Sequence, residues 1–248
     1  MKINMRKKDF IAKINPLYQY GIAHRGLHTK DFTENGINAF KNAIDNNVAF
    51  EYDIHLTKDN DLVVCHDSEL ERTTGKKGII EDLTVKEIKE NYKLLDGSTI
   101  MTLKELLEMT DEKVPQVIEL KVYNKNYKPL AKRTIEELKS VKDKSKFLII
   151  SFDPRALFPF KKKYGFMRQL LVCKSHEYTY MFRHFFESLD VETILLKEKR
   201  IQKYQKNHYF NVWTVEDEKT VDEVLPFTDT ITFQHVSKDY VSEKLKTK

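Results

Sequence analysis

Residues 50–67, FEYDIHLTKDNDLVVCHD, contain two carboxylates two positions apart, a short polar link and an apolar run that ends in a histidine. Side chains at positions i and i+2 of a strand share one face, so Glu51 and Asp53 are predicted to project side by side. Two inward-facing carboxylates are costly in free energy unless a cation neutralises them. His66 follows the apolar run, which places a titratable ring at the end of a buried strand. The link from Asp53 to Leu62 is too short for a helix, so we expect a hairpin or a tight return.

Outward from this stretch, short apolar runs alternate with amphipathic segments, which is the pattern of βαβ units around a parallel sheet. Strands are also predicted over residues 20–23, 115–121, 147–151, 168–172, 192–196 and 209–214, with a short apolar piece around Ile231, and helices over 38–44, 130–141, 154–164, 178–188, 198–205 and 215–225. About eight such units in 248 residues suit one closed barrel. We therefore predict an α/β fold, a single (β/α)8 TIM-type barrel with an irregular excursion around residues 66–114.

The composition describes a soluble, folded chain and does not favour a nucleic-acid partner. Apolar residues make up 40% and charged residues 33%, as in globular proteins. The net charge of +5 mildly favours an anionic substrate through electrostatic steering, and the absence of a concentrated basic patch argues against nucleic acid. Residues 1–18 are interpreted as a basic N-terminal leader and residues 19–248 as the barrel domain. Within the excursion, Thr84-Glu87 and Thr102-Glu105 are capping boxes that predict two short helices.

The two cysteines, Cys65 and Cys173, lie in apolar runs, which is typical of buried, inert thiols in a reducing compartment. No stretch approaches the ~18 apolar residues of a membrane span, and the N-terminus lacks the apolar core of a signal peptide. We therefore predict a cytoplasmic protein. Peripheral lipid contact and the oligomeric state are left open.

Titratable groups fall at or near the ends of several predicted strands. In a parallel barrel, the C-terminal ends of the strands converge on one mouth. Carboxylates gathered there would be strongly unfavourable without a cation, and hard oxygen ligands suit Mg²⁺ or Ca²⁺ better than Zn²⁺. The groups are His24, the pair Glu51 and Asp53, His66, and the pair Glu119 and Lys121.

Such a mouth suits attack on a phosphodiester, whose negative charge repels a nucleophile. A divalent ion would neutralise the non-bridging oxygens and polarise phosphorus, and Arg25 and Lys121 would hold the same oxygens. Two histidines, with a reference pKa near ~6.5, would divide the proton work between the attacking and the leaving oxygen.

A series of short motifs runs through residues 20–121. They are Ala23-His24-Arg25-Gly26, Glu34-Asn35 ahead of Ala39-Phe40, Glu51-x-Asp53, Leu56-Thr57-Lys58-Asp59, Val63-Val64-x-His66-Asp67, Arg72-Thr73-Thr74-Gly75 and Glu119-x-Lys121. Each motif alone is weak, but in this order and spacing they resemble the glycerophosphodiester phosphodiesterase family. The resemblance is thinner after residue 121.

This resemblance implies a phospholipase-C-like barrel that cleaves glycerophosphodiesters to glycerol 3-phosphate and an alcohol. It implies catalytic residues His24 and His66, metal ligands Glu51, Asp53 and Glu119, and phosphate contacts from Arg25 and Lys121. In related enzymes a substrate hydroxyl beside the phosphate can act as the first nucleophile and give a cyclic phosphate. The sequence leaves that step open, as it does the choice between Mg²⁺ and Ca²⁺.

The sequence departs from the family pattern at three places. Residues 33–36, Thr-Glu-Asn-Gly, stand where the family often has Pro-Glu-Asn-Thr, and Glu34 is kept as the expected partner of Arg25. Residues 213–216 are Trp-Thr-Val-Glu in place of Trp-Thr-Val-Asn, and residues 232–235 are Thr-Phe-Gln-His in place of Thr-Asp-x-Pro. These departures alter the pocket wall that would meet the glycerol or the alcohol, so the alcohol of the substrate is left open. Trp213 suits barrel packing and a substrate-facing wall equally well.

Three other interpretations stay open. A phospholipase-D-like enzyme acting on lysophospholipids would use an apolar mouth, and residues 152–186 mix many aromatic with basic side chains; we interpret that region as core or a subunit contact. A barrel without activity would serve binding, and a zinc hydrolase would use His24 and His66 as ligands. The other histidines are interpreted as surface or packing residues: His28, His55, His176, His184, His208 and His235.

Overall fold

The computed structural model describes residues 5–160 and 164–248. Two parts of the sequence-based expectations lie outside the described residues. They are residues 1–4 of the predicted leader and the lysine run 161–163 in the predicted helix 154–164.

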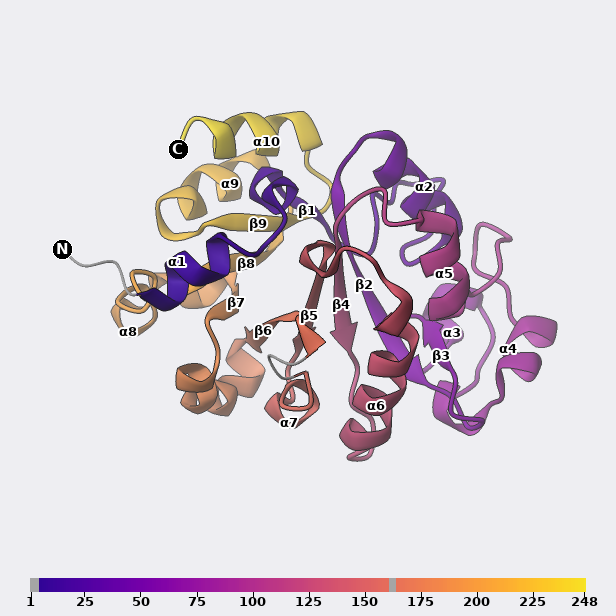
Figure 1. Cartoon of the computed structure of the whole chain (residues 1–248). Coiled ribbons are helices and arrows are strands. Elements are labelled where there is room, and N and C mark those ends of the chain that lie inside the picture. The colour runs from indigo at the N-terminus through magenta and orange to yellow at the C-terminus, as the bar shows by residue number, and fades with distance from the viewer. Residues whose placement is uncertain (1–4, 161–163) are drawn as a thin grey trace.

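Eight parallel strands of the described chain form a closed barrel, which confirms the predicted (β/α)8 architecture (Figure 1). Strand β1 pairs with both β2 and β9, and this double pairing closes the ring. A further strand, β3 (Leu62–Val64), pairs antiparallel with β2 outside the ring, so the predicted hairpin is also confirmed. The barrel strands are β1 (Ile22–Ala23), β2 (Ala49–Leu56), β4 (Gln116–Leu120), β5 (Phe147–Ser151), β6 (Met167–Val172), β7 (Ser188–Glu192), β8 (Tyr209–Val215) and β9 (Thr230–Phe233).

Helices cover the outside of the barrel, because each turns an apolar face toward the strands. In α2 (Ile37–Asp45), Ala39, Phe40 and Ala43 are buried, and the Phe40 ring lies 5.0 Å from the ring of Phe50 on β2. Further helices are α5 (Leu103–Thr110), α6 (Tyr127–Glu137), α7 (Pro154–Leu157), α8 (Lys199–Gln202), α9 (Glu218–Val224) and α10 (Lys238–Lys246).

The N-terminal helix α1 (Met5–Ile11) and the 3₁₀ segment η1 (Pro16–Tyr20) pack against the barrel. Phe10 and Tyr18 are both buried, and the Tyr18 hydroxyl donates a hydrogen bond to the carbonyl of Gln116 on β4 at 2.7 Å. These contacts attach the predicted leader to the barrel wall. The domain boundary at residue 18 stays a prediction.

The predicted excursion lies between β3 and β4 and forms a satellite core beside the barrel. It contains α3 (Glu71–Thr74), the 3₁₀ segment η2 (Ile80–Asp82), α4 (Val85–Asn91) and α5. Both predicted capping boxes are formed, since Thr84 and Thr102 each accept a hydrogen bond from the backbone three residues on, and the glutamate there returns one. The satellite core consists of Val63, Cys65, Leu70, Ile80, Ile88, Tyr92, Leu94 and Ile100.

Replacing Thr102 with alanine is expected to lower the free energy of unfolding by about 1 kcal/mol, because the N-terminal backbone of α5 loses its cap. Urea unfolding measures the change. Thr99→Ala is the matched control, because this substitution removes the same side-chain atoms from a threonine that does not cap a helix. Equal effects of the two substitutions would contradict a stabilising role of the cap.

Three predicted elements between residues 154 and 196 were wrong. The predicted strand 192–196 is the 3₁₀ segment η7 (Thr193–Lys197), and the barrel strand is β7, just before it. The predicted helix 178–188 is the 3₁₀ segment η6 (Lys174–Phe185), and the predicted helix 154–164 is reduced to α7 in its described part. The run Ile194-Leu195-Leu196 is more apolar than β7, which carries Asp190. A single-sequence pattern therefore favours the wrong segment.

Most aromatic side chains of region 152–186 lie in the core or pack against it, which is one of the two interpretations offered from the sequence. Phe160, Phe166 and Phe186 are buried, whereas Tyr178 is 56% and Phe185 61% exposed. None of the helices in the described part of the chain is both long and apolar enough to cross a bilayer.

Candidate active site

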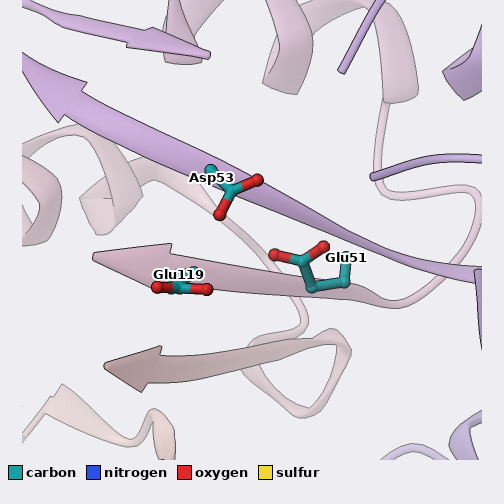
Figure 2. Close-up of side chains that lie close together, drawn as sticks. All are labelled: Glu51, Asp53 and Glu119. Carbon is teal, nitrogen blue, oxygen red and sulfur yellow. The ribbon is translucent and has the colours of Figure 1, made fainter. Parts of the chain in front are cut away.

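Three carboxylates from two neighbouring barrel strands, β2 and β4, lie close together (Figure 2). Glu51 and Asp53 lie two positions apart on β2 and share its inner face. The parallel register pairs Asp53 with Glu119 on β4, which brings the third carboxylate beside them. One oxygen of each lies within 4.8 Å of the others, and all three side chains are buried.

The close approach of the three buried carboxylates in this acidic cluster makes it costly in free energy to ionise all of them. Burial, together with the neighbouring carboxylates Asp53 and Glu119, holds the pKa of Glu51 well above its usual value. Burial likewise raises the pKa of Glu119. Burial acts in the same direction on Asp53, but Lys121, His66 and Arg25 outweigh it and hold the Asp53 pKa below its usual range.

Two oxygens of the acidic cluster have no hydrogen-bond donor, and this is the observation that fits a metal ion. Glu51 Oε1 and Asp53 Oδ1 are buried and unpartnered, although Lys121 Nζ lies 3.4 Å from Asp53 Oδ1. Buried, unsatisfied carboxylate oxygens are expensive unless a cation compensates them. The candidate metal ligands are all carboxylate oxygens, which suit Mg²⁺ or Ca²⁺. Within the described residues, the candidate ligand group contains no histidine.

His24 follows β1 at the rim of the barrel. Its Nδ1 lies 2.6 Å from Oε1 of Gln234, which follows β9. Burial, with a further contribution from the Arg25 guanidinium, lowers the pKa of His24 to about 4. The imidazole is therefore neutral at neutral pH.

His66 follows β3 and is supported on both sides. Its Nδ1 lies 2.6 Å from Oδ1 of Asp67, and Asp67 accepts a hydrogen bond from Arg72 at 2.5 Å. The buried His55 ring lies 3.0 Å from the carbonyl of His66 and 2.7 Å from Glu81. Burial lowers the pKa of His66, with the carboxylates of Asp53 and Asp67 acting in the opposite direction.

Two cations border the acidic cluster. Lys121 Nζ lies 3.0 Å from Glu119 Oε1. Burial alone would lower the pKa of Lys121, but the neighbouring carboxylates outweigh it and raise this pKa above its usual value. Arg25 donates its backbone N–H to Glu51 and its guanidinium to Glu34 at 2.8 Å, the pairing expected from the sequence.

All eight site residues expected from the sequence except Asp53 line one cavity of about 390 Å³. Trp213 forms part of its wall and also packs on Phe152, with ring centroids 5.6 Å apart, a position compatible with both of the interpretations left open. A second groove of about 500 Å³ adjoins this cavity over the loops that follow β4 and β5. The two share His66, Glu119, Lys121, Phe152 and His176.

Several residues in or near the cavity were missed from the sequence. Asn35 donates to Asp53 Oδ2 at 2.9 Å, and its place in the Glu34-Asn35 motif was the available signal. His55 and His176 were interpreted as surface or packing residues; His55 supports His66, and His176 lines the cavity. Asp190 lines the cavity from β7, the strand that the sequence pattern misplaced.

Asp190 predicts a pH dependence of stability, because burial raises its pKa to about 8, far above the ~3.9 of an unfolded aspartate. At a pH between these two pKa values, Asp190 keeps its proton in the folded chain and has released it in the unfolded chain. The free energy of unfolding therefore falls with rising pH, by about 1.4 kcal/mol per unit from this group. Asp190→Asn removes the titration, so its stability relative to wild type is expected to grow from pH 5 to pH 8. Urea unfolding at both pH values tests this, and a constant difference would contradict it.

Comparisons with known proteins agree on one family. The model described as "Glycerophosphoryl diester phosphodiesterase family" matches residues 24–234. The chain is 36% identical over 149 residues to "Glycerophosphodiester phosphodiesterase" of Caldanaerobacter subterraneus, covering 57% of this chain and 61% of that protein. The protein of the same name from Bacillus altitudinis is 31% identical over 149 residues, with 56% and 60% covered. The matches thus span about three fifths of the length of these relatives.

Among solved structures, the chain is similar to a glycerophosphodiester phosphodiesterase from Parabacteroides distasonis. The TM-score is 0.76 at 25% sequence identity, and the match covers 91% of this chain and 96% of that one. This likeness extends over the whole barrel rather than over the early motifs alone.

Proposed function

This chain belongs to the glycerophosphoryl diester phosphodiesterase family, and from that premise we propose that it hydrolyses glycerophosphodiesters to glycerol 3-phosphate and an alcohol. The resemblance found in the sequence is thereby confirmed. The observation that carries the proposed reaction is the meeting of three buried carboxylates with two histidines and two cations, all of which except Asp53 line one cavity. This combination suits an anionic ester whose leaving alkoxide needs a proton.

We assign the role of general base to His24 and that of general acid to His66. His24 is the more deeply buried ring, and its low pKa keeps it neutral and able to accept the proton of the attacking oxygen. His66 has Asp67 against its Nδ1, and this carboxylate opposes the lowering of the His66 pKa by burial, so it favours the protonated ring that a general acid needs. The nucleophile, either water or a substrate hydroxyl, is not assigned.

Glu51, Asp53 and Glu119 are proposed to hold one divalent cation, Mg²⁺ or Ca²⁺, whose chemistry would be to neutralise the phosphate oxygens and polarise phosphorus. Lys121 and Arg25 border the same cavity and would contact the non-bridging oxygens. Trp213 would form the wall against which the glycerol or the alcohol packs.

The cavity supports a small diester better than a lysophospholipid. The exposed Phe185 lies in a separate pocket with Phe10 and Phe166, away from the acidic cluster. Tyr178, which is also exposed and belongs to the same region 152–186, lines the groove beside the cavity. A cytoplasmic location, suggested by the two isolated cysteines, is part of the same proposal.

The test is release of glycerol 3-phosphate from glycerophosphocholine and glycerophosphoethanolamine, with EDTA and with Mg²⁺, Ca²⁺ or Zn²⁺ added back. Release restored by Mg²⁺ or Ca²⁺ is expected, and restoration by Zn²⁺ alone would favour the zinc hydrolase. Release from lysophospholipids only would replace the substrate class. Cation binding without turnover of any of these esters would favour a barrel that only binds.

A further inference from the structure

One of the positions at which the chain departs from its family pattern, Glu216, contacts Gln234 beside His24. Glu216 stands where the family commonly has asparagine, and Gln234 occupies the variable position of the late family motif. Gln234 Oε1 lies 2.6 Å from His24 Nδ1, and Gln234 Nε2 donates to Glu216 Oε1 at 2.5 Å. The three side chains come from three different strand ends, those of β1, β8 and β9.

The direction of these hydrogen bonds follows from the chemistry of the groups. An ionised carboxylate only accepts, so Glu216 fixes the amide of Gln234 with its NH₂ group toward Glu216. The amide oxygen must then face His24. A neutral imidazole has one donor and one acceptor nitrogen, and the nitrogen next to an amide oxygen must be the donor.

We propose that Glu216 and Gln234 are positioning residues that hold His24 in the tautomer with its hydrogen on Nδ1, which leaves Nε2 as the basic nitrogen. The use of this nitrogen in catalysis rests on the proposed function; the tautomer itself rests on the contacts alone. A carboxylate in place of Gln234 would impose the same tautomer but would add a negative charge against His24. The amide of Gln234 fixes the His24 ring without that charge. The charge that orients the amide belongs to the exposed Glu216, which is separated from His24 by the Gln234 side chain.

Other charged and titratable groups act on His24, but they do not bond to its Nδ1. Arg25, Asp53 and His66 exert electrostatic effects on the ring.

The test replaces the hydrogen-bond acceptor at position 216 with a donor. In Glu216→Lys the new ammonium can only donate, so it favours the amide orientation that turns the NH₂ group of Gln234 toward His24. We expect the ¹⁵N shifts of His24 to move toward the Nε2–H tautomer and kcat at pH 8 to fall about tenfold, equivalent to about 1.4 kcal/mol. KM is expected to change little. The ¹⁵N spectra are recorded on the full chain with Mg²⁺, and His24→Asn identifies the signals.

Adding Gln234→Glu to this variant provides the rescue. The new carboxylate can pair with the lysine and accept from His24 Nδ1, so the double variant E216K/Q234E is expected to regain the Nδ1–H tautomer and most of the lost kcat. Glu218→Lys makes the same charge change two residues away, at the exposed start of α9, and is expected to behave like wild type.

An unchanged His24 tautomer in E216K, or no return of the tautomer in E216K/Q234E, would overturn the inference. Equal loss of kcat in E218K would show a general effect of charge and would overturn it as well. If the wild-type chain hydrolyses no glycerophosphodiester while the tautomer responds as expected, the proposed function fails and the assignment of the hydrogen bonds stands.

Discussion

Glu51→Gln is expected to lower kcat/KM for glycerophosphodiesters by about 10²- to 10³-fold, because it removes one of the three charges proposed to hold the cation. The same substitution is expected to raise the free energy of unfolding of the cation-free protein. Glu51 is 3% exposed, lies beside two other carboxylates and has an oxygen without a hydrogen-bond donor. The raised pKa of Glu51 shows that a carboxyl here costs folding free energy at neutral pH, and glutamine fills the same volume without that cost. A gain in stability would show that the loss of activity does not come from misfolding.

Initial rates over a Mg²⁺ titration and urea unfolding in EDTA measure the two effects of this substitution. Glu192→Gln is the matched control, since Glu192 lines the same cavity but is not a member of the acidic cluster. It is expected to keep the wild-type cation titration. An unchanged titration in E51Q would exclude Glu51 as a ligand.

Replacing either proposed catalytic histidine is expected to lower kcat by about 10²- to 10⁴-fold, the usual contribution of a positioned acid or base. The two roles are separable with a nitrophenyl ester of glycerol phosphate, whose leaving group needs no proton. On that ester His66→Asn is expected to regain most of its activity, because the acid is no longer required. His24→Asn is expected to stay slow, because the attacking oxygen still needs a base.

His235→Asn controls for the removal of an imidazole near the site. His235 has a left-handed backbone with φ of 59°, a conformation that asparagine tolerates, and it does not line the cavity. Recovery of H24N rather than H66N on the nitrophenyl ester would exchange the two roles. Near-normal activity of either variant on glycerophosphocholine would remove that residue from the mechanism.

Residue periodicity and capping motifs correctly predicted the elements that depend only on residues close together in the sequence. The strand predicted over residues 147–151 is β5, and the capping boxes at Thr84 and Thr102 open α4 and α5. The alternation of strands and helices was sufficient for the barrel, because the connection between parallel strands requires a crossover. The pair Glu51 and Asp53 shares a strand face for the same local reason.

The same rules failed where the tertiary context overrides the local pattern. Asp190 weakens the apolar signal of β7, and its burial becomes evident only when the neighbouring strands exclude water from it. The roles of His55 and His176 were missed for a related reason, since a lone histidine carries no signal of what it contacts. His55 approaches the carbonyl of His66 only because the β2–β3 hairpin folds them together.

The sequence by itself determined the closed parallel barrel, the family and the chemical groups of the site. These depend on residue types and on spacings along single elements, which periodicity preserves. The tertiary structure alone decided which groups touch. Asp53 meets Glu119 through the register of β2 and β4, and His24 meets Gln234 across 210 positions of the chain. Such contacts and the burial that shifts the pKa values arise from strand pairing between distant segments, and no local pattern encodes them.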